Sequence, residues 1–166
     1  MEIIILKNNL KIGLEAINKV GNEGNLNVLP ILKNFLIETI DNKIKLSMTN
    51  LEIAITSFIF GKIIEKGNLT IPFNIFNSII NNIQSERINL KSEDNNLIIK
   101  TDNYQAKIQG IKKEEFPIIP SIDNNQNFFK ISATLFKKSL LSLISSSQIS
   151  NIKQELSGVF LNFQLS

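Results

Sequence analysis

The sequence predicts an α+β fold in which a unit of one strand, one helix and three antiparallel strands is repeated, with the helices on one face of the sheets. Three observations lead to this fold class. Apolar residues recur at helical spacing in several segments. Segments of alternating apolar and polar residues follow these helices and are separated by short turns of Asp and Asn. The same order of elements occurs twice before residue 110 and begins a third time after residue 127.

The first unit begins with a strand at residues 2–7, and a helix over about residues 10–20 follows. Asn8-Asn9 are expected to cap this helix. Its apolar face is expected to consist of Leu10, Gly13, Leu14 and Ile17. We expect three strands next, at residues 29–38, 43–48 and 51–55, separated by turns at Asp41-Asn42 and Thr49-Asn50. Leu51, Ile53 and Ile55 are expected to continue the alternation of buried and exposed positions.

The second unit has the same order of elements. A strand at residues 68–71 leads to Pro72, which is tolerated in the first turn of a helix. The helix has an apolar stripe of Phe76, Ile79, Ile80 and Ile83. Three short strands follow at residues 87–91, 96–101 and 104–109, separated by turns rich in Asp and Asn.

A loop that contains Phe116-Pro117 and Pro120 precedes a polar linker at residues 121–127. We therefore place one domain at residues 1–122 and the beginning of another at 127–166. The latter is expected to contain a strand at 128–131, a helix from Leu135 capped by Ser132 or Thr134, and a strand at 158–163. Such a helix with one or two strands does not bury its apolar stripe, so we expect the chain to be the front part of a longer polypeptide.

Composition excludes several kinds of chemistry. The chain has neither Cys nor His, which excludes disulfides and thiolate zinc sites and removes the commonest general base. The sequence contains no apolar run long enough to cross a bilayer and no signal peptide. A net charge of +3 is compatible with binding to nucleic acid. We expect no cofactor, because the sequence has neither a Gly-rich phosphate loop nor a nucleophile motif.

Five short motifs occur in the order and spacing of one protein family. They are Leu29-Pro30-Ile31-Leu32, Thr49-Asn50-Leu51-Glu52, Glu115-Phe116-Pro117, Leu135-Phe136-Lys137 and Leu156-Ser157-Gly158-Val159. With these motifs the chain resembles the bacterial sliding clamp, the DNA polymerase III beta subunit. The resemblance covers the N-terminal domain of that family and the beginning of its central domain.

The resemblance implies a DNA-clamp fold and a non-enzymatic role in DNA replication as a processivity factor. Members of this family form a head-to-tail homodimer, a ring that encircles double-stranded DNA without reading its sequence. Helices line the hole, and sheets form the outer wall. The implied partners are DNA polymerase III subunits and the clamp loader, and the implied location is the bacterial cytoplasm, with no membrane association. Each phosphate neutralised by Lys or Arg adds salt-sensitive affinity, so a few Lys among Asn and Ser suit a ring that slides.

The resemblance also gives candidate DNA-binding residues: Lys11, Lys19, Asn74, Ser150, Lys153 and Gln154. The alternative for these polar residues is an ordinary solvated surface. Asn74 and Leu26 stand where family members often carry a basic residue, which implies weaker phosphate contacts in the first domain.

Two contact sites with other proteins are implied as well. Leu156 matches a residue of the hydrophobic pocket that receives peptide motifs of polymerases and clamp loaders, and the alternative is burial in a strand. Ala106 and Ile108, on the last strand of the first domain, match positions at the dimer interface of the ring. An edge strand left unpaired invites pairing with another chain. The alternative is a capped edge without a partner. The small side chain of Ala106 replaces what is often a bulky one, which implies a weaker contact.

Two other functional classes compete with the clamp. One is a self-contained α+β protein-interaction module without a DNA role. The other is an enzyme, for which Glu93-Asp94 and Glu114-Glu115 would have to supply catalytic or metal-binding carboxylates. Both pairs are expected in turns without a convergent partner, which favours solvated turns, no catalytic residue and no metal site.

Overall fold

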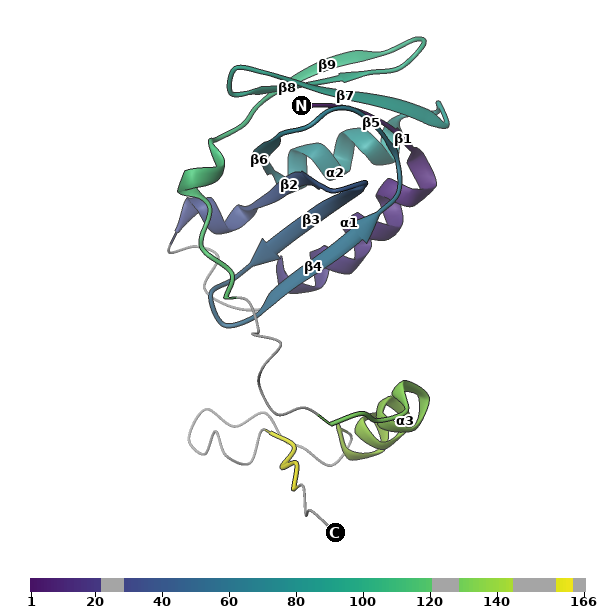
Figure 1. Cartoon of the computed structure of the whole chain (residues 1–166), viewed down its shortest axis with the longest axis vertical. Helices are drawn as coiled ribbons and strands as arrows, with labels where there is room; N and C mark the ends of the chain where they lie inside the picture. Colours follow the sequence, from purple (N-terminus) through teal and green to yellow (C-terminus); the bar gives the residue numbers. More distant parts are fainter. Residues whose placement is uncertain (22–28, 121–128, 145–157, 163–166) are drawn as a thin grey trace. The chain divides into compact units, whose positions relative to one another are not determined.

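The strands, along which apolar and polar side chains alternate, form two antiparallel sheets (Figure 1). The computed structural model describes residues 1–21, 29–120, 129–144 and 158–162, and the chain divides into two compact units, Met1–Pro120 and Ser121–Ser166. The first half of the first unit contains β1 (Glu2–Leu6), α1 (Lys7–Gly21), η1 (Pro30–Lys33), β2 (Asn34–Ile40), β3 (Lys43–Thr49), β4 (Ala54–Ile59) and β5 (Lys62–Glu65). Its second half contains β6 (Asn68–Pro72), α2 (Phe73–Asn82), β7 (Arg87–Glu93), β8 (Asn96–Lys100), β9 (Gln105–Gln109) and η2 (Lys113–Glu115).

Each half contributes its first strand to the sheet of the other half. The five-stranded sheet has the order β5-β1-β7-β8-β9, and the four-stranded sheet has the order β4-β3-β2-β6. Thus β1 pairs with β7 along its whole length, and β6 pairs with β2. The two halves repeat the same order of elements, as the sequence predicted, and the exchange of β1 and β6 joins them into one unit. The predicted fold class, α+β with repeated β-α-β-β-β units, is confirmed.

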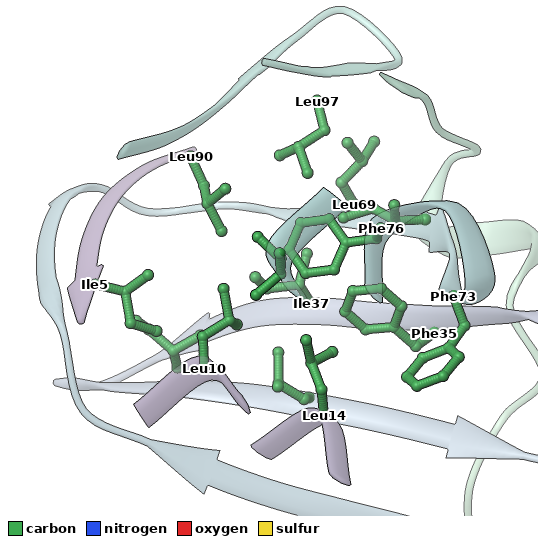
Figure 2. Close-up of a cluster of buried hydrophobic side chains, with 14 of the residues drawn as sticks. Ile5, Leu10, Leu14, Phe35, Ile37, Leu69, Phe73, Phe76, Leu90 and Leu97 are labelled. Atoms are coloured by element: carbon green, nitrogen blue, oxygen red, sulfur yellow. The ribbon is translucent and has the colours of Figure 1, made fainter. Parts of the chain in front are cut away.

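Both halves share one hydrophobic core (Figure 2). Alternate residues of the strands point into it, and the apolar stripes of α1 and α2 complete it. At the centre the ring of Phe35 from β2 meets Phe73 and Phe76 from α2, with centroid distances of 6.0 Å and 5.2 Å. Burying a large apolar side chain contributes about 1.5–3 kcal/mol, so this core supplies the main stabilising term.

Helix α1 lies close to two strands of the four-stranded sheet and to α2. Helix α1 packs on β3 and β4, and it also contacts α2. Gly13 permits this approach, because a Cβ atom there would lie 2.8 Å from Ile59 Cγ2 and 2.9 Å from Leu46 Cδ1. The side chain of Lys7 donates a hydrogen bond to the carbonyl of Ile83, which joins the first turn of α1 to the C-terminal end of α2.

Local structure differs from the sequence prediction at the start of α1. The helix begins at Lys7, so Asn8-Asn9 lie inside it and do not cap it. The amide of Lys7 instead donates to the carbonyl of Glu86, and the side-chain amide of Asn9 donates to the carbonyl of Phe60. Tertiary contacts therefore satisfy groups that we expected a local cap to satisfy.

The predicted strand positions near Leu32 and Leu51 are also wrong. Pro30–Lys33 forms a 3₁₀ turn, in which the amide of Leu32 donates to the carbonyl of Leu29, and β2 starts only at Asn34. Residues 50–53 form a loop in which Asn50 Oδ1 accepts hydrogen bonds from two backbone amides, and β4 starts at Ala54. Leu51 and Ile53 are consequently exposed and do not continue the alternation.

One strand was not predicted, and two that were predicted are absent from the described residues. The short strand β5 pairs with β1 at the edge of the five-stranded sheet. In the second unit, helix α3 (Ala133–Ile144) is present, and Phe136 donates its amide to the carbonyl of Ser132. Residues 129–131 and 158–162 are not strands.

Candidate nucleic-acid interface

Helix α1 presents a mixed outer face. Its apolar stripe is buried, whereas Asn8, Ile12, Glu15 and Lys19 are exposed. Lys19 lies in the last turn, where a cation is favoured by the helix dipole. Lys11 is half-buried at the border of this face. The sequence prediction placed both lysines on α1, and both are on the part of it that solvent reaches.

Helix α2 has no charged residue at all. Phe73, Phe76 and Ile80 face the core, and the exposed positions include Asn74, Ser78 and Asn81. Asn74 is therefore accessible in the first turn. A face made of amides and a hydroxyl offers hydrogen bonds to phosphate oxygens without a net attraction for them.

The first turns of α1 and the segment after α2 meet at a polar hollow of about 340 Å³. It is lined by Leu6, Lys7, Asn8, Lys11, Gln84 and Glu86. The hollow thus brings Lys11 close to the segment that follows α2, although the two are far apart in the sequence. Of the Lys and Arg residues described in the first unit, only Lys7, Lys11 and Lys19 belong to α1 or α2.

Strand β9 forms one edge of the five-stranded sheet, and its described partner is β8. Ala106 is half-buried against the core, and Ile108 is 5% exposed. Beside this edge lies a groove of about 580 Å³, whose lining includes Ile31, Pro72, Ile75, Ile79 and Ile108. Both predicted interface residues thus point inward, and the accessible part of the edge consists of the β9 backbone, the exposed side chains of Gln105, Lys107 and Gln109, and this largely apolar groove.

The remaining predicted site residues lie outside the described part of the chain. These are Ser150, Lys153 and Gln154 of the DNA-binding set, Leu156 of the peptide pocket, and Leu26. Their predicted roles stay predictions.

An ion-pair cluster that the sequence analysis missed joins the end of the first unit to the four-stranded sheet. Glu38 Oε1 lies 2.6 Å from Lys113 Nζ, and Glu38 Oε2 lies 3.4 Å from Lys45 Nζ. Burial opposes ionisation of Glu38, but the hydrogen bonds and charges of Lys113 and Lys45 outweigh it and lower the pKa of the carboxyl. A signal existed, since Glu38 directly follows the apolar run Phe35-Leu36-Ile37 within β2.

Two further contacts hold the same segment. Thr70 and Ile111 exchange backbone hydrogen bonds of 3.0 Å and 2.8 Å, and Phe116 is 6% exposed. We call residues 111–117 the strap. The strap covers the side of the four-stranded sheet that faces away from the core, because Glu38 and Thr70 are buried on that side.

The acidic pairs do not converge on a site. Glu93 makes an exposed ion pair of 2.8 Å with Lys91, and Asp94 follows it in a turn with a φ of 52°. Glu114 and Glu115 are exposed in the strap. Within the described ranges, no group of acidic side chains is arranged to hold a metal ion. None of the helices in those ranges has the length and apolarity needed to cross a membrane.

The fold and the helix pair define a class of protein: a clamp-type domain, built from two β-α-β-β-β halves that exchange their first strands around a common core. Residues 1–120 match the family described as DNA polymerase III beta subunit, N-terminal domain. The chain therefore belongs to the DNA polymerase III beta subunit family, the bacterial sliding clamps.

Individual relatives agree with this assignment. The beta sliding clamp of Mycoplasma genitalium is 30% identical over 98% of this chain and 44% of its own length. The Helicobacter pylori beta clamp bound to a DNA ligase peptide is 27% identical, with a TM-score of 0.67 over 74% of this chain and 34% of that one. A Bartonella birtlesii clamp bound to griselimycin, 22% identical, shares the fold with a TM-score of 0.81 over 92% of this chain and 41% of that one. The chain thus spans less than half the length of these relatives. The matches to sliding clamps favour the clamp over the protein-interaction module.

Proposed function

We propose that this chain supplies the N-terminal domain of a sliding clamp, a DNA polymerase processivity factor that encircles double-stranded DNA. The observation that carries the proposal is the family match over residues 1–120, in which α1 and α2 lie in contact beside the same core. In this proposal residues 1–122 form the N-terminal domain and residues 127–166 begin the central domain. The protein acts in the bacterial cytoplasm and catalyses no reaction.

The exposed polar faces of α1 and α2 form the DNA-facing surface in this proposal. Lys11 and Lys19 supply the phosphate contacts, and Asn74 adds a neutral hydrogen-bonding group. The absence of charge on α2 and the presence of Glu15 on α1 keep the attraction weak. Weak contacts without base readout permit movement along the duplex. In the second domain, Ser150, Lys153 and Gln154 would add to this surface.

Two protein contacts complete the proposal. The edge of β9, with Ala106 and Ile108 beside the apolar groove, pairs with a second subunit to close the homodimeric ring. Leu156 contributes to a pocket for peptides of DNA polymerase III subunits and the clamp loader. The H. pylori relative bound to a DNA ligase peptide supports a peptide-binding role of this kind.

Salt-dependent duplex binding tests the DNA-facing surface. Fluorescence anisotropy with a labelled duplex should show weaker binding by K11Q/K19Q than by the unchanged chain. The slope of log K against log salt should become shallower by about 0.9 for each phosphate that the variant no longer neutralises. The matched control is K33Q/K112Q, because Lys33 and Lys112 are exposed on the 3₁₀ turn before β2 and on the strap. Equally weakened binding by both variants would contradict the assignment of the surface to α1.

A further inference from the structure

Lys7 stands at the junction between the five-stranded sheet and the first helix. Strand β1 ends at Leu6, and α1 begins at the next residue without a loop. Leu6 pairs with Arg87 of β7, and the amide of Lys7 donates a hydrogen bond of 2.8 Å to the carbonyl of Glu86. This bond continues the pairing of β1 with β7 by one residue. The sheet therefore fixes the place from which the side chain of Lys7 extends.

The C-terminal end of α2 has no cation or glycine of its own. Its C-cap residue, Ile83, has a φ of −63°, so the chain does not leave the helix through the left-handed conformation in which Gly commonly ends a helix. The last turn of α2 carries no basic residue. The last carbonyl groups of a helix lack intrahelical donors, and together they form the negative end of its dipole. A cation from elsewhere in the fold therefore stabilises this end.

The start of α1 lies beside the end of α2 (Figure 1), and the ammonium group of Lys7 donates a hydrogen bond to the carbonyl of Ile83. Ile83 is 5% exposed and Lys7 is half-buried, so the bond is partly shielded from water. Glu86 lines the same hollow, but it forms none of the ion pairs of the described residues. Hydrogen bonds with a charged donor are about twice as strong as neutral ones. Lys7 thus links the two helices by a charge-assisted hydrogen bond.

The other contacts of the two helices are made with different elements. Helix α1 places its apolar stripe on β3 and β4, and Asn9 donates a side-chain hydrogen bond of 3.1 Å to the carbonyl of Phe60, just after β4. Helix α2 instead packs its two phenylalanines against Phe35 in the core. Of the described side chains of α1, only that of Lys7 bonds to α2 or to its C-cap residue. Removing this bond therefore leaves the two helices held mainly by different parts of the fold.

We propose that Lys7 is a positioning residue that keeps α1 and α2 at a fixed spacing, as the two halves of one DNA-facing surface; the DNA-facing role itself rests on the proposed clamp function. Lys11 and Lys19 belong to α1, and Asn74 belongs to α2. A duplex that contacts both helices meets these groups at a separation that the link between the helices sets. Holding binding groups in the bound geometry beforehand lowers the cost of ordering them on association. Loss of the bond from Lys7 should therefore broaden the spacing and weaken contacts that involve both helices.

Double electron–electron resonance measures the spacing in the absence of DNA. The chain has no Cys, and Ile12 and Asn81 are exposed on α1 and α2, so I12C/N81C places one spin label on each helix. We expect a single narrow distance distribution for the labelled chain and a broader or shifted one after K7M. K7R should restore the narrow distribution, since Arg is also a cationic donor. Anisotropy with a labelled duplex should show the same order, with weaker binding by K7M and recovery by K7R.

K11M is the matched control for the spacing, because Lys11 is half-buried on the same helix and lines the same hollow without bonding to α2. Circular dichroism confirms that the variants are folded, and K7Q replaces K7M if K7M is not. An unchanged distribution in K7M would overturn the proposal, and weaker duplex binding by that variant would then indicate a direct phosphate contact. Equal broadening by K11M, or no recovery in K7R, would overturn it too. All spacing results are independent of duplex binding by K11Q/K19Q, which tests the proposed clamp function.

Discussion

Replacing Phe35 by Ala tests whether the two halves of the first unit fold as one. Phe35 is fully buried in the first half, and its ring contacts Phe73 and Phe76 of the second half. Removing a buried Phe side chain costs about 3–5 kcal/mol, including the cavity that is left. A domain of this size has a free energy of unfolding of about 5–15 kcal/mol, so the variant should stay folded but with much less stability.

Urea denaturation measures this destabilisation in both halves. With a urea m-value of about 2 kcal/mol/M, a destabilisation of about 4 kcal/mol moves the midpoint by about 2 M. Far-UV circular dichroism reports the loss of secondary structure over the whole chain. Tyr104 is the only Tyr, and there is no Trp, so intrinsic fluorescence reports the turn between β8 and β9 in the second half.

Because β1 and β6 are exchanged between the sheets, we expect the Tyr104 transition of the Phe35→Ala variant to shift as far as the dichroism transition. A Tyr104 transition that stays at its original midpoint would refute the shared core, as would a total destabilisation below about 1 kcal/mol. Ile75→Ala serves as the control, since Ile75 is 54% exposed on α2 and its truncation should cost less than about 1 kcal/mol.

Three further substitutions have definite expected outcomes. Gly110→Ala should cost about 2–4 kcal/mol in urea denaturation, because its Cβ would lie 2.7 Å from the backbone oxygen of Thr70 and displace the strap; an unchanged midpoint would contradict that geometry. Glu38→Gln should cost about 1–3 kcal/mol at neutral pH. Since the folded pKa of Glu38 is lowered, its stabilising effect is present above the unfolded pKa and lost as pH falls through the folded value, so variant and unchanged chain should converge in acid; a constant difference down to low pH would exclude the ion pair as the cause. Leu51→Gly should raise the free energy of unfolding by about 1 kcal/mol, because Leu51 is exposed at a φ of 76°, and a decrease would mean that its side chain makes a stabilising contact.

Periodicity was sufficient to predict the elements that bury one face. The stripe of α2 and the alternation in β3, β7 and β8 are visible in a single sequence, and the structure places these elements within a few residues of their predicted bounds. This periodicity can be read from a short segment, because successive side chains of a strand point alternately to the core and to solvent.

Pairing between distant strands was not predictable in the same way. The exchange of β1 and β6 depends on which sheet edge is free after the other strands have paired, and no residue of β1 encodes its partner locally. The early start of α1 has the same cause, since Glu86 and Phe60 supply its first hydrogen bonds from other elements. The ion pair between Glu38 and Lys113 was not predictable either, because the two residues are far apart in the sequence and only the fold brings Lys113 next to β2.

The distribution of charge bears on how the proposed clamp would hold DNA. On α1 and α2 the exposed or half-buried charges are Lys7, Lys11 and Lys19 against Glu15, and the ammonium of Lys7 already donates a hydrogen bond to the carbonyl of Ile83. One or two phosphate contacts change log K by only about 0.9 each per tenfold change in salt, and non-specific binding that rests on many more contacts reaches only about 10⁻⁴ to 10⁻⁶ M at physiological salt. Affinity at this helix face is therefore too small to retain a duplex. If the proposed function holds, retention must come from closure of the chain and its partners around the DNA, and mutations at the β9 edge should impair it more than mutations on α1.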